Sequence, residues 1–266
     1  MVDPAQSLPA RIGIEGGIGE DGLEHMRLQP YPELVHRGVI RISVLALMAD
    51  MLGGWVADLH AGDDWVFTTD LSVRAPVPRV PEFVHGTSAP LRIGRTNVFA
   101  EVDMRDEHGA LFAYSHLGFV RMPRRPGDHP KPDFEASAAE WGKRPRITAP
   151  LDVEAGIEVT DASIGRVEVD LRDTLRNPAG AMQGAMVALV GEIAAEAMAT
   201  HHLGRPQIVT DLDVRYLALG RVGPVHAQAA FIGRPADGSL HVELRDSGVD
   251  GRLMTVMLAR TAPAPQ

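Results

Sequence analysis

The most informative part of this chain is the stretch Asn177-Pro-Ala-Gly-Ala-Met-Gln-Gly-Ala-Met-Val-Ala-Leu-Val-Gly-Glu192. The run from Gly184 to Gly191 carries no charge and no strong turn signal, and apolar helix formers continue past Glu192 to Thr200. Such a run predicts one long, buried helix that begins near Gly184. Glu192 then lies in the middle of a core helix, where a carboxylate is costly unless it is paired, hydrated or used in chemistry.

The spacing of the polar residues in this stretch is also informative. Asn177 lies 15 residues before Glu192, Gln183 lies 9 before it and Gly184 lies 8 before it. This pattern resembles the signature of the hotdog-fold acyl-CoA thioesterases of the phenylacetate-pathway and 4-hydroxybenzoyl-CoA type, which is an Asn, then His-Gly or Gln-Gly, then an acid at that separation. The chain departs from the more frequent form at Gln183, where the family more often has His.

The resemblance implies a role for each residue type. In the family, the glycine N–H at the helix start points at the thioester oxygen, where the helix dipole favours developing negative charge. Gly184 would supply that N–H here. The acid acts as a general base on water or as a nucleophile on the thioester carbon, and partial burial raises its pKa toward the working range. Both mechanisms stay open, and the structural alternative for Glu192 is a core carboxylate bonded to a backbone or Arg partner.

The chain contains an internal repeat. Thr69-Asp-Leu-Ser-Val-Arg74 recurs as Thr210-Asp-Leu-Asp-Val-Arg215, and a Gly-Arg pair and an Arg-Asp pair also recur, all at separations of 139 to 141 residues. With the register shifted by one further residue, to a separation of 142, Asp50 falls opposite Glu192. We therefore expect a duplicated chain, because self-similarity at a fixed period marks repeated structural units. The expected parts are a first unit at 1–121, a proline-rich linker at 122–150 and a second unit at 151–266.

Each unit is expected to contain one long helix and several antiparallel strands. The first helix is predicted at 39–59, and alternating apolar and polar residues bounded by Gly, Asp and Pro predict the strands. The predicted strands are 22–28, 66–74, 84–93, 97–105 and 111–121 in the first unit, and 165–171, 208–216, 225–232, 241–245 and 253–260 in the second. One helix wrapped by one antiparallel sheet is an α+β layout and has the hotdog shape. The chain is thus expected to be a double hotdog with pseudo-twofold symmetry, whose linker is extended in its proline segments and holds a short helix at 134–141.

The duplication suggests how an active site is assembled. By resemblance, single-unit relatives build the site at a dimer interface, with Asn and Gly from one subunit and the acid and a following Ser or Thr from its partner. In a fused pair, the second unit's Asn177, Gln183 and Gly184 would then face the first unit's Asp50 and Thr69.

The other potential site is expected to differ from the first. Glu192 and Thr210 would face the start of the first helix, where Arg41 and Ile42 stand in place of Gln and Gly. A second register makes His36-Arg-Gly38 the His-Gly motif of the first unit, but the ninth residue after His36 is then an apolar Leu. Asp50 and Glu192 both remain candidates for the working carboxylate.

Composition and residue spacing disfavour several other classes of protein. The net charge of −9 disfavours a nucleic-acid partner and an anionic membrane surface, and the absence of cysteine excludes a thiol nucleophile. No residue spacing typical of metal ligands is found, so neither a metal nor a redox cofactor is expected. The first residues lack the basic flank and apolar core of a signal peptide, and no uncharged apolar run reaches 18 residues. The expected location is the cytoplasm, without a membrane span.

These observations together predict an acyl-CoA thioesterase, with coenzyme A present only as part of the substrate. A hydratase of the same fold is disfavoured, because no His-Phe-Pro-Gly-type stretch is present. The alternative from a different class is a non-catalytic acyl-CoA-binding or regulatory hotdog protein, since Gln183 replaces the more usual His and the first unit lacks the glycine. Hotdog units usually associate further, so a homo-oligomer of double-hotdog chains is expected.

Overall fold

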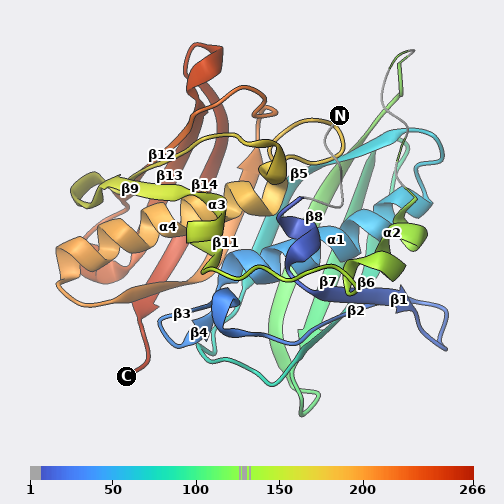
Figure 1. Ribbon diagram of the computed structural model, residues 1–266, viewed down its shortest axis with the longest axis horizontal. Helices are drawn as coiled ribbons and strands as arrows, with labels where there is room; N and C mark the ends of the chain where they lie inside the picture. Colours follow the sequence, from blue (N-terminus) through green and yellow to red (C-terminus); the bar gives the residue numbers. More distant parts are fainter. Residues whose placement is uncertain (1–6, 126, 128–130, 132) are drawn as a thin grey trace.

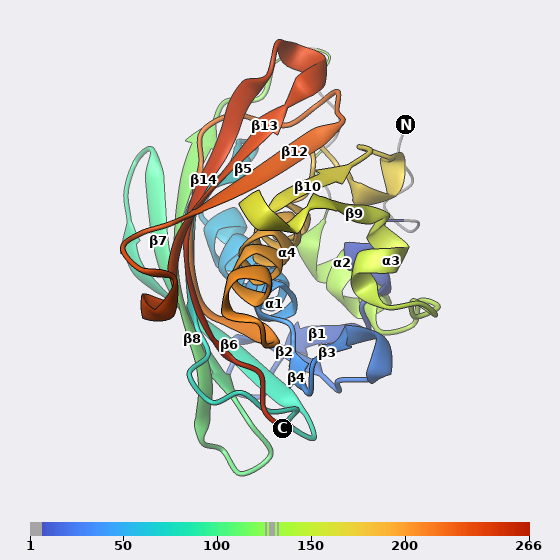
Figure 2. The same cartoon turned by 90° about the vertical axis from the view of Figure 1, so that its left-hand side faces the viewer.

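The computed structural model describes residues 7–125, 127, 131 and 133–266. Two long helices, α1 (Ile42–Leu59) and α4 (Gly184–Leu203), lie side by side against the concave face of a large antiparallel sheet (Figure 1). Figure 2 shows the sheet curving around both helices. The architecture is α+β, as the sequence predicts.

The sheet has 12 strands, and their order is mirrored about its centre. The strands of the first half and then of the second run across the sheet as β1 (Ile14–Ile18), β2 (Glu24–Leu28), β6 (Val84–Ile93), β7 (Asn97–Arg105), β8 (Leu111–Met122), β5 (Trp65–Arg74), β11 (Gln207–Tyr216), β14 (Arg252–Pro263), β13 (Ser239–Asp246), β12 (Val225–Phe231), β10 (Arg166–Val169) and β9 (Ile157–Asp161). At the centre, β5 and β11 pair antiparallel, with Val73 opposite Leu212. The two halves of the chain therefore share one continuous sheet.

The first long helix begins later than predicted. Residues 39 and 40 belong to β4 (Val39–Ile40), which pairs with β3 (Val35–His36) in a small hairpin. Gly38 has a φ of +78° in that hairpin, a conformation that glycine adopts without steric cost. The helix that follows starts at Ile42, so Asp50 is its ninth residue, and Glu192 is likewise the ninth residue of α4.

Some of the other helices and strands have the predicted bounds, and some were not predicted. The strands β6 and β7 and the short helix α2 (Phe134–Trp141) have the predicted bounds, and Asp133 caps α2 by accepting from the N–H of Ala136. The edge strands β1 and β9 and the helix α3 (Leu151–Ala155) were not predicted. The linker, which was expected to be extended in its proline segments, includes residues 126, 128–130 and 132. The start of the chain, which was expected to lack a signal peptide, includes residues 1–6. Those residues lie outside the part of the chain that the structure describes.

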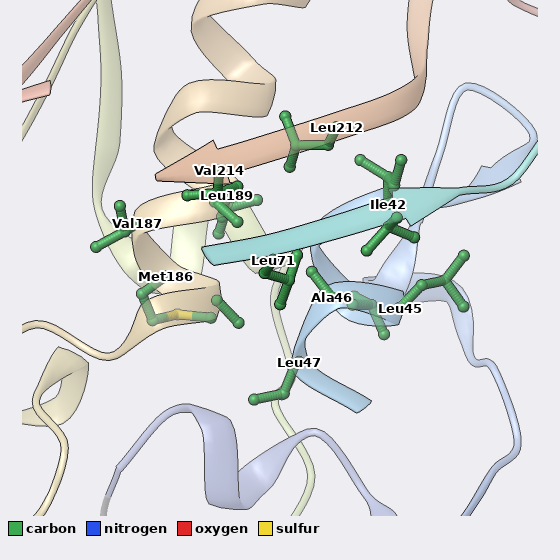
Figure 3. Packing of buried hydrophobic residues seen from close by; sticks show 14 of the residues in the cluster. Ile42, Leu45, Ala46, Leu47, Leu71, Met186, Val187, Leu189, Leu212 and Val214 are labelled. Atoms are coloured by element: carbon green, nitrogen blue, oxygen red, sulfur yellow. The ribbon is translucent and has the colours of Figure 1, made fainter. Parts of the chain in front are cut away.

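The hydrophobic core lies between the two long helices and the central strands. Leu71 of β5 and Leu212 of β11 lie close to Leu45 of α1 and Leu189 of α4, and all four are fully buried (Figure 3). Complete burial of each such side chain contributes roughly 1.5–3 kcal/mol. By length and composition α1 could span a membrane, but 72% of it is buried inside the protein, as expected of a core helix. This packing sets the start of each long helix beside the middle of the other.

Candidate active site

A cavity of about 420 Å³ lies between α1, β5 and the start of α4, at the seam between the two halves. Its shape follows from the way the central strands separate. Residues Asp70 to Arg74 of β5 pair with residues Asp211 to Arg215 of β11. The residues of β5 before Asp70 do not pair with β11. The cavity opens where the strands diverge, and it is lined by residues of both halves.

Asp50 lies on the cavity wall and is held by two hydrogen bonds from different halves of the chain. Its Oδ1 accepts from Thr68 Oγ1 at 2.6 Å, and its Oδ2 accepts from Gln183 Nε2 at 3.1 Å. Burial raises the pKa of Asp50 to about 6, although the hydrogen bond from Thr68 lowers it. The carboxyl therefore gains and loses its proton close to neutral pH, where a general base is effective.

The start of α4 presents a free backbone donor beside this carboxyl. Gln183 caps the helix, because its Oε1 accepts from the N–H of Ala185 at 2.7 Å and of Met186 at 3.2 Å. The N–H of Val187 bonds to the Gln183 carbonyl, and the hydrogen bonds of the described residues leave the N–H of Gly184 unused. An unused N–H at a helix N-terminus is a binding site for an oxygen that carries negative charge.

The lack of a side chain at Gly184 keeps this donor accessible. A Cβ at this position would lie 3.2 Å from Tyr216 Oη and 3.5 Å from Asp50 Oδ2. The Tyr216 hydroxyl donates to the Gly184 carbonyl at 3.0 Å and was not predicted to belong to the site. Burial and the nearby Asp50 raise the pKa of Tyr216 well above its usual value, so the hydroxyl keeps its proton. Its position directly after the repeated motif at 210–215 is the one sequence signal that could have indicated it.

Asn177, one of the predicted site residues, also lines the cavity. Its Oδ1 accepts from the N–H of Ala181 at 3.1 Å and closes the turn that leads to α4. The hydrogen bonds of the described residues do not use the side-chain NH₂ of Asn177, so this cavity-lining residue has a second donor. The structure thus brings Asn177, Gln183, Gly184 and Asp50 together in one place.

The residue whose hydroxyl bonds to Asp50 is Thr68, which directly precedes the predicted site residue Thr69. The Thr69 hydroxyl donates instead to Asp70 Oδ2 at 3.0 Å, although Thr69 still lines the cavity. The cause is a β-bulge, since the register between β5 and β8 shifts between Thr68 and Asp70. A bulge adds one residue to a strand and changes which side chains share a face. Thr210 lies at the corresponding bulge of β11 and bonds to Asp211.

Glu192 lies in a different environment from Asp50. Its side chain is 2% exposed, its Oε1 lies 3.5 Å from Arg41 Nη1, and its Oε2 accepts from the N–H of Ser43 at 3.1 Å. Burial raises the pKa of Glu192, and the Arg41 charge opposes this. A second carboxylate, that of Glu196, lies 3.7 Å from Arg41 Nη1. These partners correspond to the structural alternative for Glu192, a core carboxylate paired with Arg and backbone.

The space around Thr210 is nearly filled. The cavity there has a volume of about 10 Å³, and Ile42 and the segment after β5 form part of its wall. The N–H of Ala75 bonds to the Thr210 carbonyl at 2.9 Å, so the segment after β5 stays paired with β11 at this end of the seam. At the other end, beside Asp50, the two strands separate. The two potential sites are therefore unequal in volume. Among the described residues, no group of three or more His, Asp or Glu side chains is arranged to hold a metal ion.

The sequence matches no family model and no curated protein. Several solved structures share its fold over nearly the whole chain. The tesB protein of Mycobacterium avium subspecies paratuberculosis is 14% identical, with a TM-score of 0.64, and the match covers 97% of this chain and 98% of that one. A proposed oleoyl thioesterase of Lactobacillus plantarum is 16% identical, with a TM-score of 0.62 and coverage of 98% and 100%. The 12:0-ACP thioesterase of Umbellularia californica is 12% identical, with a TM-score of 0.59 and coverage of 90% and 96%. The chain therefore has the hotdog-like α+β fold of these thioesterases.

Proposed function

We propose that this protein hydrolyses acyl-CoA thioesters to a free acid and coenzyme A. The observation that carries the proposal is the meeting of an unused helix-start N–H, that of Gly184, with a carboxyl whose pKa is about 6, that of Asp50, in one cavity. A donor for a developing oxyanion and a base for water are the two groups that thioester hydrolysis requires. The thioesterase names of the structural neighbours agree with this chemistry.

The proposed reaction uses each of these groups once. The thioester carbonyl oxygen accepts a hydrogen bond from Gly184 N–H, with the Asn177 amide close by. Asp50 removes a proton from a water molecule as that water attacks the carbonyl carbon, and the C=O bond becomes a single bond to an oxyanion. When the carbonyl reforms, the C–S bond breaks, and the proton on Asp50 passes to the departing sulfur. The acid and the free thiol then leave, and the enzyme returns to its starting state.

Attack by Asp50 itself on the carbonyl carbon is the other mechanism that the sequence leaves open. Both oxygens of Asp50 already accept a hydrogen bond, from Thr68 and from Gln183. A carboxylate held on both oxygens is well placed to accept a proton from water without moving. We therefore favour the general-base route.

The proposal includes a double hotdog with one working site. The mirrored strand order and the matching positions of Asp50 and Glu192 in their helices support two related units. In the working site, Gln183 and Gly184 start the helix that faces Asp50. At the corresponding place Arg41 and Ile42 start the other helix, and Arg41 pairs with the acid. This pairing supports Asp50, and not Glu192, as the working carboxylate.

The test is the release of free thiol from a panel of acyl-CoAs and acyl-carrier-protein thioesters. Wild-type protein is expected to release coenzyme A, and Asp50→Asn is expected to lower kcat by about 10²–10⁴-fold, the usual contribution of a general base. Glu192→Gln is the matched control and is expected to keep the wild-type rate. Turnover of carrier-protein thioesters alone would contradict the coenzyme A part of the proposal. Tight binding of acyl-CoA without turnover would support the binding-protein alternative.

A further inference from the structure

The cavity extends from Asp50 along one face of α1 to a charged pair, Asp58 and Lys131. Asp50 and Asp58 are eight residues apart on the helix, which corresponds to about 12 Å at 1.5 Å per residue. Met51 and Gly54 lie between them on α1, and the apolar side chains of Trp65, Phe119 and Met122 also line the cavity. This part of the cavity has the length of an extended chain of about ten carbon atoms.

The charged pair is largely buried and only partly satisfied. Lys131 Nζ lies 2.6 Å from Asp58 Oδ1 and donates to the Gly62 carbonyl at 2.7 Å, and the two side chains are 13% and 17% exposed. A lysine ammonium has three N–H donors, and the contacts of the described residues, to Asp58 and Gly62, use two of them. The hydrogen bonds of the described residues engage only Oδ1 of Asp58, so Oδ2 remains an acceptor. Beside the apolar part of the wall, the lining of the cavity therefore has one donor and one acceptor.

On the basis of the proposed function, we infer that the preferred acyl group carries a hydroxyl at its far end, which donates to Asp58 and accepts from Lys131. A hydrocarbon end would cover these two groups without replacing their hydrogen bonds to water, which is unfavourable. A terminal carboxylate would meet the Asp58 charge, and a terminal ammonium would meet the Lys131 charge. A hydroxyl is neutral and both donates and accepts, so it fits the pair.

The test compares three coenzyme A thioesters of equal chain length, which are decanoyl, ω-hydroxydecanoyl and ω-carboxynonanoyl. The wild-type protein is expected to show a kcat/KM for the ω-hydroxy thioester about 10–100-fold above that of decanoyl, because hydrogen bonds to charged groups are worth that much. The carboxylated thioester is expected to be the poorest of the three. Equal values for the hydroxylated and plain chains, or a preference for the plain chain, would overturn the inference.

The double variant Asp58→Leu with Lys131→Met replaces the pair by apolar side chains, a change that proteins often tolerate. It is expected to hydrolyse decanoyl-CoA and to lose the preference for the hydroxylated chain. Lys143→Met is the matched control, because Lys143 is an exposed lysine of the same linker that pairs with Glu140. This control is expected to keep the wild-type preference. A preference that persists in the double variant would show that the pair only fastens the linker to α1.

A binding measurement separates this inference from the proposed function. Thioether analogues of the same three coenzyme A derivatives cannot be hydrolysed, and calorimetry gives their Kd with the wild-type protein. A tenfold or greater preference for the hydroxylated thioether without any thioester turnover would reject the hydrolase and keep the inference. Rapid turnover of all three thioesters with equal Kd values for the thioethers would support the hydrolase and reject the inferred preference for a hydroxyl.

Discussion

The side-chain amide of Gln183 donates to Oδ2 of Asp50 at 3.1 Å and so connects residues that are 133 positions apart in the sequence. The same amide caps α4, because its Oε1 accepts from the N–H of Ala185. One side chain therefore fixes both the helix start that offers a donor and the carboxyl that faces it. Such preorganisation by neighbouring hydrogen bonds is what places catalytic groups accurately.

We predict that Asp50→Asn makes the protein more stable at pH 8. The pKa of Asp50 is about 6 in the folded protein against 3.8 for the free side chain, so the folded state holds its proton more tightly. Stability is therefore lost as the pH rises from about 4 to about 6, and the loss is complete above that range. Asparagine carries no charge and avoids this loss, which amounts to about 1–3 kcal/mol.

The measurement is urea unfolding of both proteins at pH 8 and at pH 4. The gain for Asp50→Asn is expected at pH 8 and is expected to vanish at pH 4, where Asp50 is protonated in the wild-type fold. A gain of equal size at both pH values would contradict the assignment of the effect to the Asp50 charge. An asparagine that lowers stability at pH 8 would contradict it too.

The same pKa predicts the pH dependence of hydrolysis. A general base works in its deprotonated form, so kcat/KM is expected to rise about tenfold per pH unit below about 6 and to level off above it. The Gln183→Glu variant places a second carboxyl beside Asp50, and like charges raise the pKa of a carboxyl, so its profile is expected to shift to higher pH. Profiles of the two proteins from pH 4.5 to 9, with stability checked at each end, are the measurement. A wild-type midpoint near 4 would mean that another group controls the rate.

The adjacent threonines Thr68 and Thr69 give a matched pair of variants. Thr68→Val removes the 2.6 Å hydrogen bond to Asp50, and this bond lowers the pKa of Asp50, so the variant is expected to have a higher kinetic pKa and a lower rate at pH 7. Thr69→Val removes a bond to Asp70 and is expected to leave the kinetic pKa unchanged. The opposite result would show that Thr69, and not Thr68, controls the pKa of Asp50.

Gly184→Ala tests whether the space above the helix start is needed. The new Cβ would lie 3.2 Å from Tyr216 Oη and 3.5 Å from Asp50 Oδ2, where the reacting carbonyl is proposed to lie. The backbone N–H remains, so we expect the fold to survive and kcat/KM to fall about 10²-fold, as for a substrate displaced by about 1 Å. Steady-state kinetics together with a thermal melt would show this. An unchanged kcat/KM would remove Gly184 from the proposed site.

The repeat explains why so much of the fold was predictable. Because Thr69–Arg74 and Thr210–Arg215 recur almost unchanged, the two long helices and most of the long strands could be aligned with one another. The edge strands were missed, because β1 contains two adjacent glycines and β9 is largely exposed, so neither shows the buried alternation of an inner strand. The hairpin of β3 and β4 was missed for a similar reason, since two-residue strands leave no period to detect.

The site was predictable only as far as spacing along a helix reaches. The resemblance to the thioesterase signature indicated Gln183 and Gly184, and the register of the repeat indicated Asp50. Thr68 could not be distinguished from Thr69, because a bulge is not visible in residue types. The Asp58–Lys131 pair joins a helix to a linker, and no local pattern indicates which helix residue a linker lysine contacts.

The acid on the other helix provides the final prediction, because Arg41 occupies the place that Gln183 has in the proposed site. Arg41→Met would leave the buried carboxylates of Glu192 and Glu196 without a guanidinium partner. Losing one member of a buried ion pair typically costs about 3–5 kcal/mol, so a large loss of stability is expected at pH 8. The loss is expected to shrink as the pH falls, because burial already raises the pKa of Glu192 and the variant carboxyl takes up its proton more readily.

Activity separates this role from a catalytic one. The specific activity of the folded Arg41→Met protein at low temperature is expected to stay at the wild-type value, because the pair lies at the nearly filled side of the seam and not in the larger cavity. Urea unfolding at pH 8 and pH 5.5, with thiol release measured on the same samples, tests both expectations. If kcat fell as far as in Asp50→Asn while the fold remained intact, Glu192 and Arg41 would have to take part in the reaction, and a single working site at Asp50 would no longer account for the chemistry.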